Sequence, residues 1–308
     1  MAKARSALAQ DVIWRVEALG FDVISVALRA LPVDWVSAAG GGLFRLLGPL
    51  TSADKVARRN LRLAFPEISD AEHRRLLSAQ WENVGRLFAE FPLTDRLTLA
   101  SGRVEMIGAE RLAAITASGR PAVYVSGHFS NWEISVQAPL STGRPCEITY
   151  REANNPYIDL RIKRSRFRYG VRLFAPKGGE GGRRLLAALN SGVSIAMLND
   201  QRYDEGVAAA FFGRLVPTLP AAVRLALRFG AVLQPISVQR LRGARFRCIA
   251  HPPILLKDSG DRGADIEAGV VAINAFIEAC VRERPQEWFW VHRRWPAAAY
   301  AELSAQGL

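Results

Sequence analysis

A histidine lies five positions before a glutamate in the segment YVSGHFSNWEI, residues 124–134. The two residues are His128 and Glu133, and the apolar run before them is typical of a buried strand. In open α/β sheets, ligands bind just beyond the carboxyl ends of the strands. A neutral imidazole placed there could accept a hydroxyl proton, and a carboxylate could hold its other ring N–H. The pattern is therefore compatible with general-base catalysis.

The same residues also have a purely structural interpretation. Ser130 and Glu133 match the S-x-x-E capping box, so a helix is expected to start at Asn131. Glu133 could then satisfy a backbone N–H, and His128 could be a hydrogen-bonded loop residue. The spacing alone leaves both interpretations open. The sequence has no G-x-S-x-G nucleophile motif, so in the catalytic interpretation the attacking hydroxyl belongs to the substrate.

The elements around this segment predict an α/β fold with a mostly parallel mixed sheet flanked by helices. The β-branched runs PAVYVSG, VSIAML and AVLQPISVQ alternate with helical stretches at 183–189 and 221–229. The segment ISVQRLRGARFRCIA predicts an antiparallel hairpin, and a last helix is expected over 265–282. Earlier helices are expected near 53–64 and, with Ser69 as N-cap, from about 70 to 91.

The N-terminal region is rich in apolar residues but carries charges. Between residues 12 and 31, Arg15, Asp22 and Arg29 fall on one narrow stripe of a helix, and Glu17 lies outside it. This pattern favours a helix in a membrane interface over a spanning helix, because each buried charge costs roughly 2.5–3.5 kcal/mol. A helix packed deeply in a core is the alternative. We expect residues 1–33 to form a membrane-anchoring helix and residues 34–308 to form one catalytic domain.

The overall charge favours an anionic partner. The 308 residues include 41 Lys and Arg against 29 Asp and Glu, a formal net charge of +12. Nucleic acid, an acidic leaflet and an acidic carrier protein all fit this charge. The three cysteines form neither a CxxC pair nor a disulfide framework, which favours a reduced, cytoplasmic setting. The four histidines show no paired ligand spacing, so no metal site is expected.

Five blocks along the chain resemble, in order, those of the lipid A biosynthesis (lauroyl/myristoyl) acyltransferase family, within the lysophospholipid acyltransferase superfamily. They are ARRNLRLAFPE (57–67), HFSNWE (128–133), YREANNP (150–156), NDQR with FFGRLVPT (199–202 and 211–218), and PQEWFWVHRRW (285–295). The H-x-x-x-x-D/E motif is weak by itself. Five blocks in the family's order are specific, and they extend over nearly the whole chain.

The resemblance implies a role for each matching residue. His128 is implied to be the base that activates an acceptor hydroxyl, and Glu133 to support it. Asp200 matches an acidic family position near the same histidine, so it competes with Glu133 for orienting the ring.

A family arginine that contacts a phosphate or the developing oxyanion matches Arg166 best, with Arg164 and Arg168 close by. Arg202, where some relatives carry another residue, and Asn131, within the histidine block, are further candidates for substrate binding.

The implied reaction moves a fatty acyl chain from an acyl thioester to a hydroxyl of a lipid A precursor. The donor is acyl carrier protein or coenzyme A as co-substrate, with no bound cofactor and no metal. The expected partners are acyl carrier protein and an anionic lipid at the cytoplasmic face of the inner membrane, without nucleic acid. Other glycolipids, an ornithine lipid or a lysophospholipid are alternative acceptors. No block resembles F-P-E-G-T, which disfavours glycerophospholipid acylation. A non-catalytic basic protein that binds membrane or nucleic acid is the rival class.

Overall fold

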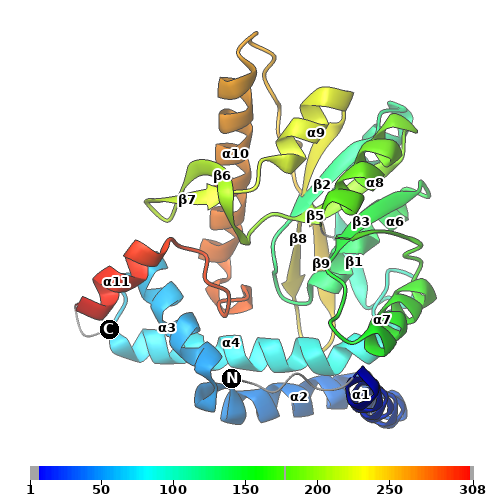
Figure 1. Ribbon diagram of the computed structural model, residues 1–308, viewed down its shortest axis with the longest axis vertical. Helices are drawn as coiled ribbons and strands as arrows, with labels where there is room; N and C mark the ends of the chain where they lie inside the picture. The colour runs from blue at the N-terminus through cyan, green and yellow to red at the C-terminus, as the bar shows by residue number, and fades with distance from the viewer. Residues whose placement is uncertain (1–6, 177, 306–308) are drawn as a thin grey trace.

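The computed structural model describes residues 7–176 and 178–305 of the chain. Its centre is a seven-stranded sheet in the order β1-β9-β8-β2-β5-β3-β4 (Figure 1). The strands are β1 Val104–Ile107, β2 Ala122–Ser126, β3 Cys146–Tyr150, β4 Leu173–Pro176, β5 Ser194–Leu198, β8 Val232–Arg240 and β9 Phe246–Ala250. All neighbouring pairs are parallel except the β8–β9 hairpin. The predicted mostly parallel mixed sheet is confirmed. A separate antiparallel pair consists of β6 Arg202–Phe211 and β7 Arg214–Thr218.

Helices flank both faces of this sheet. They are α1 Ala7–Arg29, α2 Val33–Leu47, α3 Ser52–Ala64, α4 Asp70–Glu90, α5 Ala109–Ala117, α6 Gln137–Ser141, α7 Pro156–Arg168, α8 Gly179–Asn190, α9 Ala221–Phe229, α10 Arg262–Glu283 and α11 Ala297–Ala305. Short 3₁₀ turns are η1 Gly48–Leu50, η2 Phe91–Arg96, η3 Trp132–Val136 and η4 Pro285–Glu287. The helices predicted from the sequence outside the His128 segment are present, and Ser69 caps α4 by accepting the N–H of Glu72 at 3.2 Å.

The central strand β2 is buried on both faces, as its continuous apolar run predicts. Val123 and Val125 face one core cluster, which includes side chains of α8, α9 and α10. Ala122 and Tyr124 face the other, which includes side chains of α5, α6 and η2. Because helices cover both faces of β2, the residues that follow it are held at the carboxyl-terminal end of the sheet rather than free in a surface loop.

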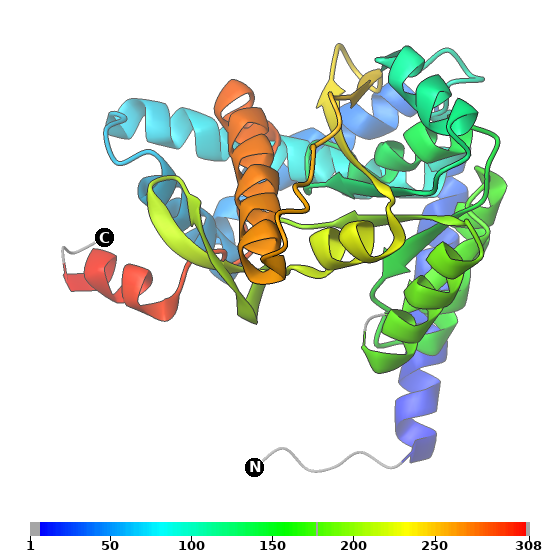
Figure 2. The same ribbon diagram turned by 90° about the horizontal axis from the view of Figure 1, so that it is seen from above.

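Helix α1 presents its polar stripe to the protein and its apolar side to the outside. Asp22 binds Arg161 of α7 at 2.6 Å, and Arg29 binds Asp95 of η2 at 2.6 Å. Large apolar side chains are exposed along the helix: Leu8, Val12, Val16, Leu19, Val23, Ile24 and Val26. Figure 2 shows the first half of α1 projecting beyond the rest of the molecule. Packing deep in a core, the alternative left open by the sequence, is excluded for this helix.

None of the described helices combines the length and the apolar character that crossing a bilayer would require. Of the predicted anchoring segment 1–33, residues 1–6 lie outside the described residues.

The capping box predicted at Ser130 is wrong. The turn η3 begins at Trp132, and no side chain caps it. Ser130 has a φ of 50°, and its N–H donates to the carbonyl oxygen of Glu287 at 2.6 Å. Glu133 cannot complete the box because its carboxylate is bound by Arg166. The N–H of Ser130, which a capping box would pair with Glu133, thus binds a distant segment of the chain instead. That segment holds Ser130 in a strained backbone conformation.

Helices α2 and α4 cross at two glycines. A Cβ on Gly85 would lie 2.2 Å from the carbonyl oxygen of Gly40, and a Cβ on Gly40 would lie 2.6 Å from that of Gly85. The backbones therefore approach too closely for any side chain at this crossing.

Replacing Gly85 with alanine is expected to lower the free energy of unfolding by about 1–3 kcal/mol, because α2 must move away from α4. Gly42→Ala is the matched control, since a Cβ there meets nothing within 4 Å and α2 gains helix propensity. Urea denaturation of the two variants tests this difference. Equal midpoints would contradict the close crossing.

Candidate active site

His128 and Asp200 emerge from adjacent parallel strands. In the pairing of β2 with β5, Ser126 lies opposite Leu198. The N–H of Asn199 extends the ladder by donating to the carbonyl oxygen of Ser126 at 2.8 Å. His128 and Asp200 each follow two residues after these paired ends. Because parallel strands end at the same edge of a sheet, this equal offset brings the two side chains together.

The Asp200 carboxylate holds both the His128 ring and the backbone that carries it. Oδ1 of Asp200 lies 2.6 Å from the ring Nδ1, and Oδ2 accepts the backbone N–H of His128 at 2.7 Å. Oδ2 also accepts the indole N–H of Trp288 at 2.7 Å. These three contacts, two from His128 and one from Trp288, fix the imidazole at the carboxyl-terminal end of the sheet.

Asp200 remains ionised at this site. Burial alone would raise its pKa, but the adjacent His128 and the hydrogen bonds from His128 and Trp288 lower the pKa to about 2. An ionised carboxylate only accepts hydrogen bonds, so Nδ1 of His128 carries the ring hydrogen. In the neutral ring, Nε2 then keeps its lone pair, which is the form that a general base requires.

Glu133 is bound by a different group. Nε and Nη2 of Arg166 lie 3.0 and 2.6 Å from its two carboxylate oxygens, and the Tyr169 hydroxyl donates to it at 2.5 Å. Burial alone would raise the pKa of Glu133, but Arg166 and these hydrogen bonds lower it. Among the described residues, no hydrogen bond joins Glu133 to His128. Of the two carboxylates that the sequence left in competition, Asp200 contacts the ring and Glu133 pairs with Arg166.

Arg166 is a buried cation, and one of its guanidinium nitrogens makes no hydrogen bond to the described residues. That nitrogen is the buried Nη1. Burial alone would lower the pKa of Arg166, but Glu133 raises it above its usual value, so the guanidinium stays charged. The guanidinium also lies 4.9 Å from the centre of the Tyr150 ring. The arginine selected from the sequence therefore lies at the site with a free N–H.

The C-terminal segment supports the histidine loop. Phe129 and Trp288 form an isolated antiparallel bridge, and the N–H of Phe289 donates to the carbonyl oxygen of His128 at 3.1 Å. The ring of Trp132 packs edge-on against His128, with 4.9 Å between ring centres. The last of the five sequence blocks therefore meets the histidine block in space.

A cavity of about 380 Å³ opens beside His128. The polar part of its wall includes His128, Glu133, Arg166, Gln201 and His292. The apolar part is larger and includes Phe91, Val136, Ile148, Ile162, Met197, Leu198 and Ile236. The apolar lining residues can therefore bind hydrocarbon, and the polar ones include an imidazole and a cation.

Gln201 and His292 were not among the site residues predicted from the sequence, yet both line the cavity. The amide nitrogen of Gln201 lies 3.4 Å from Nε2 of His128 and 3.1 Å from Nε2 of His292. The rings of His128 and His292 have centres 6.0 Å apart. Both missed residues belong to blocks that carried the family resemblance. The sequence showed the positions of these blocks, but it did not show which of their side chains face His128.

Two other predicted substrate-binding residues lie elsewhere. Asn131 is fully buried, and its amide donates to Glu90 at 2.9 Å, so it supports the loop rather than lining the cavity. Arg202 pairs with Asp204 and is not part of the wall. Both predictions came from proximity in sequence to a reactive residue, which does not determine the direction of a side chain.

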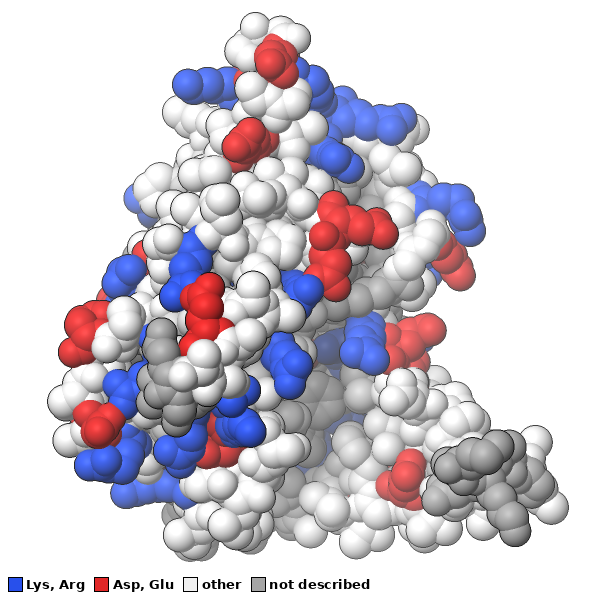
Figure 3. All heavy atoms as spheres, turned by 60° about the vertical axis from the view of Figure 1, so that its left-hand side comes forward, with Lys and Arg blue, Asp and Glu red and all other residues white. Residues whose placement is uncertain are grey.

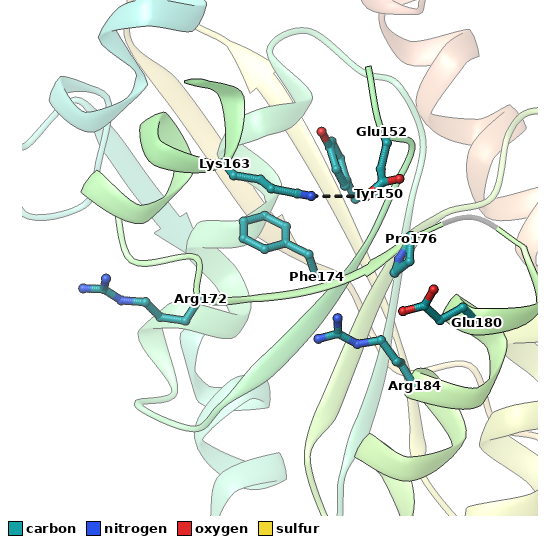
Figure 4. Close-up of a pocket in the computed structure, with 8 residues that line it drawn as sticks. All are labelled: Tyr150, Glu152, Lys163, Arg172, Phe174, Pro176, Glu180 and Arg184. Atoms are coloured by element: carbon teal, nitrogen blue, oxygen red, sulfur yellow. Dashed lines mark hydrogen bonds and ion pairs between the residues drawn. The ribbon is translucent and has the colours of Figure 1, made fainter. Parts of the chain in front are cut away.

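A second cavity, of about 430 Å³, shares Tyr150 with the first. Figure 4 shows its acidic and basic side chains facing one another. Lys163 pairs with Glu152 at 3.2 Å, and Arg184 pairs with Glu147 at 2.8 Å. Lys163 and Arg184 therefore already have carboxylate partners within or beside this cavity.

Comparison with known proteins identifies the family. The model of the bacterial lipid A biosynthesis acyltransferase family matches residues 7–297. The chain belongs to this family. It is 28% identical to the lipid A biosynthesis lauroyltransferase of Escherichia coli (strain K12), over 90% of both chains. It is 23% identical to the lipid A biosynthesis palmitoleoyltransferase of the same organism, over 83% of this chain and 82% of the relative. A lipid A biosynthesis acyltransferase of Shigella flexneri shows the same identity and coverage.

Membership of the bacterial lipid A biosynthesis acyltransferase family makes the chain an acyltransferase. This conclusion removes the non-catalytic rival that composition had left open. In this acyltransferase the His128–Asp200 pair lies beside a largely apolar cavity that can hold a hydrocarbon chain.

Proposed function

We propose that this acyltransferase moves a fatty acyl chain from an acyl thioester on acyl carrier protein to a hydroxyl of a lipid A precursor. The observation that carries the proposal is the His128 ring, held by Asp200 through Nδ1, beside a largely apolar cavity of about 380 Å³. The curated relatives, named as lipid A lauroyl and palmitoleoyl transferases, support the acceptor class. No resident cofactor is needed for this chemistry.

In the proposed step, Nε2 of His128 takes the proton of the acceptor hydroxyl while the hydroxyl oxygen attacks the thioester carbonyl carbon. Asp200 stabilises the imidazolium that forms. The C–S bond then breaks, and the leaving thiolate receives the proton from His128. Nη1 of Arg166, buried and without a partner among the described residues, is our candidate donor to the oxyanion.

The proposed location is the cytoplasmic face of the inner membrane. Its basis is the exposed apolar side of α1, together with the net charge of +12, which favours an anionic leaflet. Sedimentation of the purified protein with anionic and neutral vesicles measures this association. Failure to co-sediment with either would contradict it.

Mass spectrometry of lipid A, from cells with and without this protein, tests the proposed acceptor. Cells lacking the protein are expected to accumulate lipid A short of one acyl chain, and the missing mass gives the chain length. Purified protein is expected to restore that mass from acyl carrier protein loaded with the same chain. Identical lipid A in both strains, with no transfer by purified protein, would overturn the proposal.

A further inference from the structure

The side-chain amide of Gln201 lies directly against the nitrogen of His128 that the proposed reaction uses. Its nitrogen is 3.4 Å from Nε2 of His128 and 3.1 Å from Nε2 of His292. Because Asp200 binds Nδ1 of His128, Nε2 has a lone pair and no hydrogen, so the group that faces it must donate. An amide nitrogen carries two hydrogens and can donate to both imidazoles at once. In this structure the lone pair of the base is therefore occupied by Gln201.

Protein groups cover the other sides of the His128 ring. The Trp132 ring packs edge-on, with 4.9 Å between ring centres, and the Phe289 ring lies parallel to it at 6.2 Å. Asp200 covers Nδ1. The His128 side chain is 13% exposed. A molecule that gives a proton to Nε2 therefore has to approach through the cavity, where Gln201 lies.

His292 is a firmly held second acceptor for the same amide. Its own carbonyl oxygen, and that of Trp290, each accept from the side-chain amide of Asn60 at 2.5 Å. The His292 ring also packs against Phe289, with 5.4 Å between ring centres. A hydrogen bond to an anchored ring restricts rotation of the Gln201 amide. The amide is thus kept in front of Nε2.

Water competes with the acceptor hydroxyl in the proposed reaction. In the side reaction, Nε2 of His128 takes a proton from water while the water oxygen attacks the thioester carbonyl carbon. The C–S bond then breaks, and the leaving thiolate receives the proton from His128. The products are a free fatty acid and a thiol. Because this hydrolysis uses the same base and the same donor as transfer, an acyltransferase has to keep water away from the base while the donor is bound.

The acyl donor is expected to reach the site independently of the acceptor. The chain carries a formal net charge of +12, and Figure 3 shows Lys and Arg side chains grouped to one side of a hollow on the face that it draws. Acyl carrier protein and coenzyme A are both anionic, so this charge attracts either form of the donor. A bound thioester then waits for the lipid, and water at Nε2 would cleave it during that time.

We propose that the Gln201 amide keeps water from Nε2 of His128 until the hydroxyl of the lipid acceptor displaces it. This inference rests on the proposed function. The lipid brings acyl chains and sugar rings whose contacts with the protein can offset the loss of one amide hydrogen bond. A water molecule brings no such contacts and gains less by displacing the amide. Gln201 thereby discriminates between two hydroxyl nucleophiles, while Asp200 orients the ring.

The test measures the fatty acid released from acyl thioesters when no acceptor is added. The probes are the dodecanoyl thioesters of acyl carrier protein and of coenzyme A, and mass spectrometry quantifies the free acid. Gln201→Ala is expected to hydrolyse them about tenfold faster than wild type, or about 1.4 kcal/mol, which is the size of one hydrogen bond. The matched control is Gln239→Ala, the same change on β8 outside this cavity, and it is expected to hydrolyse them at the wild-type rate.

Transfer to the lipid A precursor is expected to respond in the opposite sense. Because the acceptor no longer has to displace the amide, its KM in Gln201→Ala is expected to fall about threefold while kcat stays near wild type. Damage to the fold would raise KM or lower kcat instead. His292→Phe keeps a ring against Phe289 but removes the second acceptor of the amide. It is expected to raise hydrolysis about threefold, since the amide keeps its contact with His128.

Three results would overturn this role of Gln201. The first is unchanged hydrolysis in Gln201→Ala, and the second is a rise of the same size in Gln239→Ala. The third is rapid hydrolysis that persists in the double variant His128→Ala/Gln201→Ala, because His128 would then not be the group that activates the water.

Comparing hydrolysis with transfer separates this inference from the proposed function. If Gln201→Ala hydrolyses the thioesters faster, yet neither it nor wild type transfers the chain to the lipid A precursor, the proposed acceptor is wrong and the role of Gln201 stands. If both proteins transfer the chain and hydrolyse the thioesters at equal rates, the role of Gln201 is wrong and the transfer reaction stands.

Discussion

Replacement of Asp200 with asparagine is expected to lower kcat by roughly 10³- to 10⁴-fold with little loss of folded protein. The side-chain amide of asparagine can donate to Nδ1 of His128. The ring hydrogen would then lie on Nε2, and the proposed base would be lost. The amide also cannot stabilise the imidazolium by charge. Because the pKa of Asp200 is about 2, the wild-type carboxylate is ionised throughout the working pH range. The defect is therefore expected at every pH of the assay, measured as transfer from acyl carrier protein.

Glu133→Gln is the informative comparison for this result. The amide oxygen of glutamine can still accept from Arg166 or Tyr169, and no hydrogen bond to His128 is lost among the described residues. We expect a smaller fall in kcat, about tenfold, with His128→Ala as the reference for loss of the base. If Glu133→Gln matched His128→Ala while Asp200→Asn stayed near wild type, the assignment of ring support to Asp200 would be wrong.

The sheet and its helices were predictable because each depends on local patterns. The β-branched run of β2 and the Ser69 cap of α4 use only the residues within a few positions of themselves. The His128–Asp200 pair depends on the register of β2 and β5, which lie about seventy residues apart in the chain. Sequence blocks could place both residues near one site. They could not decide which carboxylate meets the ring.

One sequence pattern predicted a structure that the chain does not adopt, and another left the orientation of a helix open. Ser130 and Glu133 fit a capping box, but Ser130 is bound by Glu287 and Glu133 by Arg166, both from distant parts of the chain. The stripe of charges on α1 left open a helix in a membrane interface or one packed in a core. Its Asp22 and Arg29 bind Arg161 and Asp95, which leaves the apolar side outward. Periodicity gives the two faces of a helix, and only the packing partner determines which one is buried.

Replacement of Arg166 with methionine is expected to destabilise the fold by about 3–5 kcal/mol at neutral pH. The reason is that Glu133, buried at the site, would lose its counter-charge. Without Arg166, burial would raise the pKa of Glu133 above its value in the unfolded chain. A carboxyl group with a raised folded pKa destabilises the protein at high pH, and this penalty disappears as the pH falls below the unfolded value. Urea denaturation at neutral pH and near pH 4 measures the change, and the deficit is expected to be smaller in acid.

The double variant Glu133→Gln/Arg166→Met separates the loss of charge pairing from the loss of packing. It buries no unpaired charge, so it is expected to recover about 2 kcal/mol or more of the stability lost in Arg166→Met. The Tyr169 hydroxyl can still donate to the glutamine oxygen in place of the carboxylate. Strict additivity of the two single changes would show that Glu133 and Arg166 are not coupled. A recovered fold without transfer activity would instead separate the two uses of Arg166. Stability would then require only that no unpaired charge is buried, whereas acyl transfer would require the guanidinium itself.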